Sequence, residues 1–499
     1  MDYNEMEYNV VIIGGGTAGV AAAYALAQLN GDYKIALVEK QEILGGTAVN
    51  GLVYDWIQGI NPPYFEKICY ELGKKDWCKI YKRSDKNSAL VLESCVSTED
   101  LKYTWLGRRF YEDAAEGNFS NDEGHIFFEP WKLAEKYESD LISCGKIDIL
   151  KGFSFCSANS MDGNVKEIVV KKGQEVRHII ADFFIDCSAD GVLCRYVNGE
   201  EGKDYYIGLD RRETYDEDVL IENDPSYDTY KMEALIAPSL FFEIVPESEG
   251  KDSSLINTDR EAADKEGVSA EGYAFKYVGS TSIRTCNPMG GLGISGEAVL
   301  QYDDTEALRK AFIERVPAYW ELVKDKSWAK GWAPRRYAKM PGIRETYRIE
   351  CEKMLTLSDL EQNVFERIKA GEGEDIIAVG SHPVDSHGTI GCSGNALNEF
   401  NDKRLKPYGI SYYSLVPKKL NNVWIACRAF GASHLALSSA RINKVMAQLG
   451  WAAGNAARYC LEKQKATNKL ELDDILCLRT EEYTAFDKQA ERALTALRK

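Results

Sequence analysis

Val10-Val-Ile-Ile-Gly-Gly-Gly-Thr-Ala-Gly19 is the stretch of sequence that decides the fold. Its four apolar residues predict a buried strand, and three glycines follow directly. The alanine-rich run Val20–Leu29 predicts a helix, and the apolar run Ile35–Val38 predicts a second strand. The order strand, tight turn, helix, strand predicts an α/β fold, a doubly wound Rossmann-like domain of mostly parallel strands.

Gly14, Gly16 and Gly19 form a G-x-G-x-x-G pattern at the head of the predicted helix. In this context the first glycine permits the turn, the second lets main-chain amides approach a pyrophosphate, and the third allows close packing. Glu39 ends the second strand, where an acid accepts hydrogen bonds from an adenosine ribose and disfavours a 2′-phosphate. The predicted dinucleotide-binding residues are Gly14, Gly15, Gly16, Thr17, Ala18, Gly19, Glu39 and Lys40.

A second glycine segment, Leu44-Gly45-Gly46-Thr47, follows Glu39 closely. Such a glycine pair lets the chain run beside a ribityl chain and pyrophosphate, so the segment favours FAD over NAD. We therefore add Gly45, Gly46 and Thr47 to the cofactor site. No histidine lies between Gly45 and Gly124, so we expect the flavin to be bound non-covalently.

Charge and hydropathy exclude several classes of function. The 499 residues carry a formal charge of −17, which would repel a phosphate backbone, so we expect no nucleic-acid partner. The longest apolar stretch, around Val20–Ala27, is too short to span a bilayer, so we expect no membrane insertion. The polar run Met1–Asn9 has no signal-peptide pattern, and we expect a cytoplasmic location.

The thirteen cysteines include no C-x-x-C pair. This spacing argues against a zinc knuckle or an iron-sulfur cluster and favours reduced, mostly buried thiols. We expect no metal site.

The cofactor domain is predicted to be discontinuous. Strands are expected at Val176–Ile180, Phe183–Asp186 and Asn422–Ala426, and long helices at Leu357–Ala370 and Leu435–Cys460. The FAD-binding domain is assigned to 1–55, 145–204 and 402–465, and an inserted mixed α+β substrate or cap domain to 56–144 and 205–401. The charged segment 466–499 is assigned as a C-terminal tail.

Gly291, Gly293 and Gly296 form a second G-x-G-x-x-G. It follows Asn287-Pro288 rather than a clear strand, and an acidic run comes after it. We interpret it as a structural loop and not as a second phosphate site.

Further segments carry a family resemblance: Ile185-Asp-Cys-Ser-Ala-Asp190-Gly191, Pro341–Arg348, Pro383-Val-Asp385-Ser-His387-Gly388, Tyr408–Pro417 and Asn421–Arg428. Together with the glycine loops, they resemble the glutathione-reductase-like flavoproteins, in particular the FAD-dependent oxidoreductases related to the flavin subunit of heterodisulfide reductase. The iron-sulfur motifs of that enzyme are missing. The resemblance implies that Asp190 lies beside the ribityl-pyrophosphate region and that Arg428 belongs to the flavin site.

The chain departs from the family pattern at four positions. Ala189 and Cys427 stand where glycine is usual, and Ser411 and Tyr413 stand where the family commonly has proline and arginine.

The candidate catalytic residues are His387, His434, Arg344 and Arg441. A histidine can take or give a proton, and a guanidinium can bind a carboxylate or stabilise a reduced, anionic flavin. His434 also precedes a predicted helix whose N-terminus could face the flavin. The alternative is that the histidines are structural residues held by hydrogen bonds and that the arginines form interdomain salt bridges.

These observations predict an FAD-dependent oxidoreductase that acts on a small organic substrate by hydride transfer to or from non-covalent FAD. Two alternatives stay open at this point, an NAD-dependent dehydrogenase and a flavin-binding protein without catalysis. The sequence does not identify the substrate or the electron donor or acceptor.

Overall fold

A computed structural model describes residues 5–27, 31–57, 63–83, 90–94, 125–197, 204–210, 212–215, 217, 235–249, 256, 258, 265–278, 280, 282–302, 304–385 and 405–480. Its main sheet contains, in spatial order, the parallel strands β7 (Ile147–Lys151), β2 (Ile35–Glu39), β1 (Glu5–Ile13), β10 (Glu175–Asp186) and β19 (Val423–Ile425). The chain starts at the centre of this sheet and extends it in both directions. This topology confirms the predicted doubly wound α/β fold.

The central strands are buried on both faces. All five residues of β2 are buried, and Val10, Val11 and Ile12 of β1 have no exposed surface. Strands of this kind are continuous apolar runs because helices or other layers cover both faces of a parallel sheet.

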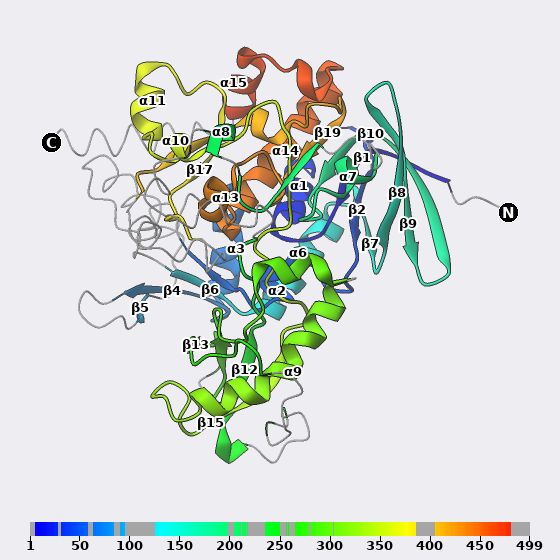
Figure 1. The fold of residues 1–499 in the computed structure, drawn as a ribbon. Coiled ribbons are helices and arrows are strands. Elements are labelled where there is room, and N and C mark those ends of the chain that lie inside the picture. Colours follow the sequence, from blue (N-terminus) through cyan, green and yellow to red (C-terminus); the bar gives the residue numbers. More distant parts are fainter. Residues whose placement is uncertain are drawn as a thin grey trace.

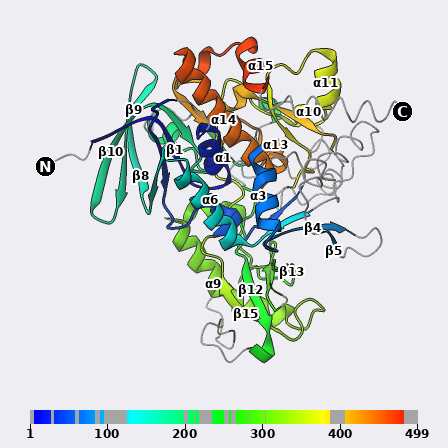
Figure 2. The ribbon, with the colours of Figure 1, turned by 180° about the vertical axis from the view of Figure 1, so that it is seen from behind.

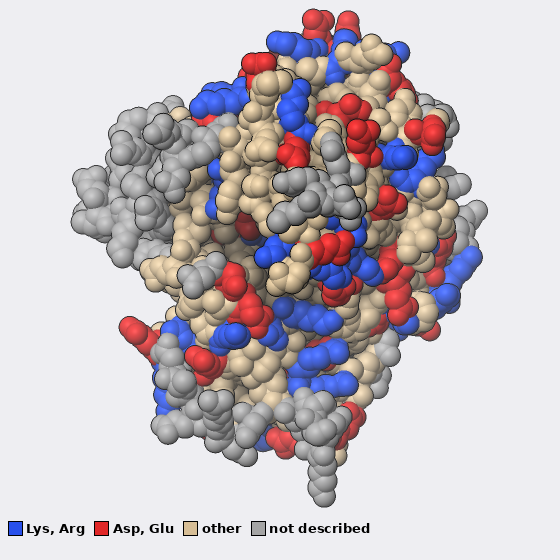
Figure 3. Space-filling model, turned by 90° about the vertical axis from the view of Figure 1, so that its right-hand side faces the viewer, with Lys and Arg blue, Asp and Glu red and all other residues tan. Residues whose placement is uncertain are grey.

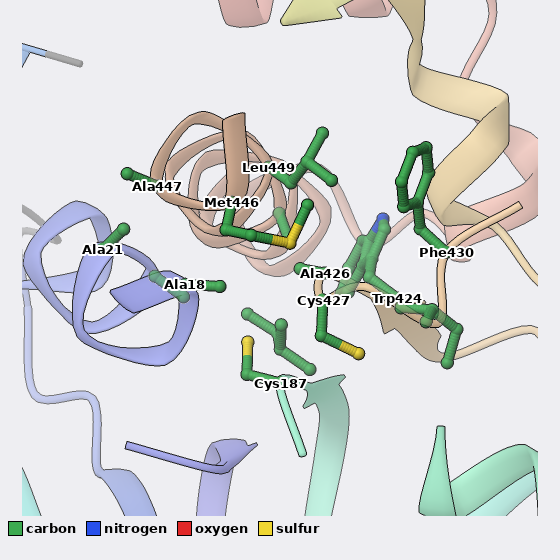
Figure 4. Packing of buried hydrophobic residues seen from close by; sticks show 14 of the residues in the cluster. Ala18, Ala21, Cys187, Trp424, Ala426, Cys427, Phe430, Met446, Ala447 and Leu449 are labelled. Atoms are coloured by element: carbon green, nitrogen blue, oxygen red, sulfur yellow. The ribbon is translucent and has the colours of Figure 1, made fainter. Parts of the chain in front are cut away.

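Two helices far apart in sequence lie side by side over this sheet, α1 (Thr17–Leu26) and α14 (Asn443–Lys463) (Figure 1). A Cβ atom added at Gly450 would lie 1.9 Å from the carbonyl oxygen of Ala18. The main chains of the two helices are therefore in contact, and Figure 4 shows Ala18 of α1 facing Met446 of α14. This contact fixes the start of α14 next to the first glycine loop.

The predicted strands at Val176–Ile180 and Phe183–Asp186 are one strand, β10. Its first half pairs with β9 (Asn164–Lys172) in an antiparallel meander that also contains β8 (Ser154–Met161), and its second half pairs with β19. A single long strand can thus change partners along its length and link the meander to the parallel sheet.

A second hydrophobic core lies in the cap region, below the main sheet in Figure 1. It is built on an antiparallel sheet in the order β13 (Tyr273–Lys276), β14 (Arg284–Asn287), β12 (Phe242–Pro246) and β15 (Trp332–Tyr337). Helix α9 (Thr305–Val323) packs on it through Phe312, Tyr319 and Trp320. Tyr54, which follows the second glycine segment, is also part of this core, and its hydroxyl lies 2.6 Å from that of Thr285.

Further elements complete the described part of the chain. The strands are β3 (Asp55–Trp56), β4 (Cys78–Arg83), β5 (Leu90–Ser94), β6 (His125–Phe128), β11 (Tyr205–Ile207), β16 (Tyr347–Ile349), β17 (Ile376–Gly380) and β18 (Tyr408–Ser411). The α-helices are α2 (Gly46–Val49), α3 (Pro63–Gly73), α6 (Pro130–Ser143), α7 (Val192–Val197), α8 (Arg212–Tyr215), α10 (Leu357–Leu360), α11 (Val364–Ala370), α13 (His434–Ala440) and α15 (Leu472–Thr480). The 3₁₀ helices are η3 (Glu247–Glu249), η4 (Gly296–Gln301), η5 (Tyr412–Leu415) and η6 (Thr467–Lys469).

Two predicted helices are each divided into two. The stretch Leu357–Ala370 forms α10 and α11, and Leu435–Cys460 lies within α13 and α14, which are separated at Arg441 and Ile442. No proline or glycine marks the second break. Hydrogen bonds to residues distant in sequence stabilise this break instead. Arg441 donates to Asp385, and the side-chain amide of Asn443 donates to the carbonyl of Val53.

The division into domains stays a prediction, but the packing near its boundaries is defined. Helix α6 contributes Leu133, Tyr137 and Leu141 to the core of the main sheet, and Figure 2 shows it from behind, beside α1. Leu470 and Ile475, at the start of the predicted tail, lie in the same core. Among the described residues, no helix is both long and apolar enough to cross a membrane.

Candidate functional site

A cavity of about 890 Å³ opens at the carboxyl ends of β1, β2 and β10, where a doubly wound sheet binds its ligands. Its wall includes Ile13, Val38 and Cys187 from these strand ends. The opposite wall comes from the cap sheet, including Tyr273 and Asn287. The cavity therefore joins the two cores of the molecule.

The first glycine loop forms one end of this cavity. Gly14 has φ +101°, and a Cβ there would lie 2.3 Å from the carbonyl oxygen of Cys187. A Cβ at Gly19 would lie 1.8 Å from the carbonyl oxygen of Gly14. These two glycines are required by the fold itself, which agrees with their predicted roles in the turn and in close packing.

Gly16 differs from its neighbours because no contact with the described residues requires it to be glycine. It is the N-cap of α1 with φ −74°, and the nearest atom to an added Cβ is the Cα of Gly46, at 3.7 Å. Since Gly16 lines the cavity, the space beside it is left for a ligand at the positive end of α1.

Glu39 holds the first glycine loop. Its carboxylate accepts hydrogen bonds from the amides of Gly15, at 2.6 Å, and Gln41, at 2.7 Å. Burial raises the pKa of Glu39, and these amide hydrogen bonds oppose that shift. Glu39 lines the cavity, so its carboxylate is placed both to stabilise the loop and to meet a ribose hydroxyl.

The second glycine segment lies directly against the first. The amide of Gly45 donates to the carbonyl of Gly15 at 2.8 Å, and a Cβ at Gly46 would lie 2.9 Å from the Cα of Gly16. Gly46 and Thr47 line the cavity. The two glycine segments thus form one continuous main-chain cradle, which a side chain at Gly46 would fill.

The turn after β10 carries Asp190 into the cavity wall. The buried carboxylate of Asp186 accepts hydrogen bonds from the Ser188 amide and hydroxyl and from the Leu193 amide, which shape the turn. Ala189 adopts φ +76°. This is the left-handed region, which explains why a glycine is usual at this position in the resembling family.

Asp190 and Arg428 form an ion pair at 2.7 Å, and Thr346 also donates to Asp190, at 2.8 Å. Within the described part of the chain, the buried Nε of Arg428 has no hydrogen-bond partner. Both residues line the cavity. An unsatisfied guanidinium nitrogen beside a cradle of main-chain amides fits a bound dinucleotide, which would bring acceptor oxygens to both.

A second group of charged side chains, which we call the charged end, lines the same cavity. Arg344 and Arg441 both line it, as predicted candidates, and so do Asp385 and His382. Arg344 donates to the carbonyl oxygen of Ala237 at 2.6 Å, and Arg441 donates to the carboxylate of Asp385 at 3.2 Å. Burial lowers the pKa of both arginines, to about 10 for Arg344, where the nearby charge of Arg441 adds to the effect.

His382 was not among the sequence-based candidates, although its imidazole lies at this charged end. It follows the buried strand β17 and precedes Pro383, whose carbonyl oxygen is 2.8 Å from its Nδ1. Burial lowers the pKa of His382, which favours a neutral ring, and the charge of Asp385 opposes that shift. Its position after the end of a strand was the signal that could have identified it.

His434 lies outside the cavity wall. It has no exposed surface, its Nδ1 is 2.9 Å from the carboxylate of Glu345, and its amide donates to Asp210 at 2.7 Å. Arg348, also buried, bonds to both Glu345 and Asp210. His434 thus belongs to a buried ionic network that begins one residue after Arg344. His387 lies outside the described residues.

Among the predicted cofactor residues, most line the cavity: Gly14, Gly16, Thr17, Ala18, Glu39, Lys40, Gly46, Thr47, Asp190 and Arg428. Gly15, Gly19 and Gly45 lie behind this surface and support it through the contacts given above.

One reason for interpreting the second G-x-G-x-x-G as a structural loop, the lack of a clear strand before it, is wrong. A strand, β14, does precede it directly. A Cβ at Gly296 would lie 1.7 Å from the carbonyl oxygen of Leu235, and one at Gly293 would lie 2.5 Å from the carbonyl carbon of Gly267. The space beside these glycines is filled by the main chain of the cap, which leaves no room for a phosphate. A 3₁₀ helix follows them instead of an α-helix.

The family follows from a match that extends through both cores. Residues 9–478 match the family model described as FAD dependent oxidoreductase. The chain belongs to this family. FAD is therefore the cofactor that the glycine cradle, Glu39 and Arg428 would hold, and the protein is an oxidoreductase.

Solved structures with a similar course of the chain are distant. A geranylgeranyl bacteriochlorophyll reductase-like protein from Thermoplasma acidophilum is 11% identical with a TM-score of 0.41, over 99% of this chain and 87% of that chain. PqsL from Pseudomonas aeruginosa is 11% identical with a TM-score of 0.35, over 97% of this chain and 94% of that chain. The p-nitrophenol 4-monooxygenase PnpA from Pseudomonas putida is 10% identical with a TM-score of 0.37, over 70% and 71%. No curated protein matches the sequence.

Proposed function

We propose that this family member transfers a hydride between a small organic substrate and non-covalently bound FAD. The observation that carries the proposal is the shared cavity, in which a main-chain cradle and a charged end face the same space. When bound, FAD supplies a two-electron acceptor or donor, and the protein has to position the substrate and manage charge and protons.

Each end of the cavity has a distinct task in this proposal. The two glycine segments, with Glu39, Lys40, Asp190 and Arg428, hold the cofactor. The start of α14 at Asn443 directs the positive end of a 21-residue helix at the same space.

At the charged end, Arg344 and Arg441 hold the substrate. His382 exchanges a proton with it, because a buried neutral imidazole beside Asp385 can accept one. His434 acts as a positioning residue through Glu345, and His387 stays a candidate for direct contact. The expected partner is a small molecule, and we propose a cytoplasmic location.

The first experiment is the visible absorption spectrum of the purified protein, followed by denaturation and mass identification of the released molecule. A flavin spectrum with FAD released intact supports non-covalent binding. Anaerobic addition of candidate substrates then tests hydride transfer, because reduction bleaches the flavin absorbance. Retained FAD that no organic substrate or chemical reductant can reduce would favour a flavin-binding protein without catalysis.

A further inference from the structure

Arg344 has an unusual electrostatic position for a side chain that lines a cavity. It donates a hydrogen bond to a neutral group, the carbonyl of Ala237, and within the described part of the chain no acidic side chain forms an ion pair with it. A guanidinium stays charged under nearly all conditions and has five N–H donors in a planar fork. Arg344 therefore has donors left for a ligand.

Arg441 adds to the excess of positive charge. It shares the carboxylate of Asp385, which also acts on Arg344. Glu345 acts on Arg441 as well, but Glu345 is already paired with His434 and Arg348. The buried Nε of Arg441 has no hydrogen-bond partner within the described residues. Two guanidinium groups that share the carboxylate of Asp385, together with an unsatisfied buried donor, indicate that an anionic group would fit at this place in the cavity.

Arg344 is separate from the residues predicted to hold the cofactor's phosphates, whereas the charge of Arg428 also acts on Arg441. The charged and polar groups that act on Arg344 are Arg441, Asp385 and Tyr273, and none of them belongs to either glycine segment. The phosphate end of the cavity has its own arginine, Arg428, which is paired with Asp190.

The wall around Arg344 also contains apolar side chains. Phe241, Phe275, Met340 and Ile343 line the same cavity from the cap side. A pocket that combines a cationic fork with aromatic and aliphatic walls suits a ligand with a charged group attached to an apolar body.

We propose that Arg344 and Arg441 form a carboxylate-binding subsite, and that the substrate is a small carboxylate with an apolar portion. The proposal rests on the proposed oxidoreductase function, since it names the substrate class of that same cavity. Arg344 is the principal contact because Arg441 is already engaged by Asp385.

The test uses two probes of nearly the same shape and different charge, benzoate and benzamide. Their binding to the FAD-loaded protein is measured by calorimetry and by the change in the flavin absorption spectrum. We expect benzoate to bind at least about tenfold more tightly than benzamide, because a charge-assisted hydrogen bond is worth about 1.5–3 kcal/mol.

Arg344→Gln should weaken benzoate binding by about 10- to 100-fold and leave benzamide binding and FAD content unchanged. Arg309→Gln is the matched control, because Arg309 also donates to a main-chain carbonyl of the cap, that of Ala338 at 2.8 Å, but does not line the cavity. Arg344→Lys keeps the charge without the fork, so it should lie between wild type and Arg344→Gln. It also provides a test if the glutamine variant does not fold.

Equal affinity for benzoate and benzamide in the wild type would overturn the proposal. So would an Arg344→Gln variant that loses FAD but binds benzoate normally, because Arg344 would then serve the cofactor. Failure of the wild type to retain FAD would instead contradict the proposed function, and calorimetry with benzoate would still report on the subsite.

Discussion

The two ends of the cavity recognise their ligands by opposite means. At the glycine end, Gly16 and Gly46 keep side chains out of the way, so the ligand meets main-chain amides and the start of α1. At the charged end, the side chains of Arg344, Arg441 and His382, which come from separate segments of the chain, line the cavity. The comparison suggests that affinity for the cofactor resides in the backbone, whereas choice of substrate resides in replaceable side chains.

Charge is also unevenly distributed over the surface of the molecule. The chain carries a net charge of −17, yet Figure 3 shows Lys and Arg side chains gathered near the middle of one face, below a hollow. An acidic protein with local groups of cations can still attract a small anion, because screening confines surface charges to a range of about 10 Å.

The largest effect on cofactor binding is expected for Gly16→Glu, which disrupts the glycine end. The protein has room for the new Cβ, since its nearest neighbour is 3.7 Å away, so the fold should survive. The carboxylate would enter the space reserved for the pyrophosphate, and FAD affinity should fall at least about 100-fold, or about 3 kcal/mol. Flavin content after gel filtration and the thermal midpoint measure the two parts of this prediction.

Gly16→Ala is the graded control, with a smaller loss of FAD. A folded Gly16→Glu variant that keeps its full complement of FAD would refute the assignment of the cradle.

His434→Ala tests the support behind the charged end. It removes one partner of the fully buried Glu345, and breaking a buried ion pair usually costs about 3–5 kcal/mol. Urea unfolding measures this cost. If His434 also positions the charged end, substrate reduction of the flavin should slow at a temperature where the variant is folded, with the oxidised spectrum unchanged.

His178→Ala is a matched control, because His178 pairs with Glu167 on the meander and about a quarter of its side chain is exposed. An exposed pair of this kind contributes about 0–1 kcal/mol. A His434→Ala variant no less stable than His178→Ala would show that the buried network is not a support.

The contrast between the two ends also explains what the sequence could predict. The glycine end comes from one continuous stretch, residues 14–47, in which strand, turn and helix follow one another, so its residues could be identified directly. The charged end combines Arg344, His382 and Arg441, which only the tertiary fold brings together. Arg344 and Arg441 were predicted because a guanidinium can bind a carboxylate or stabilise a reduced flavin. His382 was missed because its one signal, a position just after a strand, depends on first predicting the strand Ile376–Gly380.

The break before α14 was missed for a similar reason. The residues from Leu435 to Cys460 have helical composition without a proline or glycine at the break. Bonds to Asp385 and Val53, distant in sequence, interrupt the helix there.

Lys444 is a third cation near the cavity, but unlike Arg344 and Arg441 it does not line the wall. It has no exposed surface, and its Nζ has no hydrogen-bond partner within the described residues. Burial lowers its pKa from 10.5 to about 8. Lys444→Met should therefore raise the free energy of unfolding at pH 7 by about 3 kcal/mol, since each pKa unit corresponds to about 1.4 kcal/mol.

The pH dependence of the free energy of unfolding tests the direction of this pKa shift. Between pH 8 and 10.5 the unfolded chain holds the Lys444 proton and the folded chain has lost it, so wild-type stability should rise with pH relative to Lys444→Met. The gap between the two should close near pH 10.5. Lys463→Met, at the exposed end of the same helix, should leave stability almost unchanged. A Lys444→Met variant that is less stable at every pH would indicate that the amine has a stabilising partner.

The smallest effect concerns Ala189, at the edge of the glycine end. Its φ of +76° costs a non-glycine residue about 1–2 kcal/mol, while glycine would lose somewhat more entropy on folding. Ala189→Gly should therefore stabilise the protein by about 0.5–1 kcal/mol and retain FAD. Ala311→Gly, inside α9, should instead cost about 1 kcal/mol, because it introduces glycine into a helix interior. If both substitutions destabilise equally, the methyl group of Ala189 must make contacts that outweigh its backbone strain, and the glycine end would depend on a side chain after all.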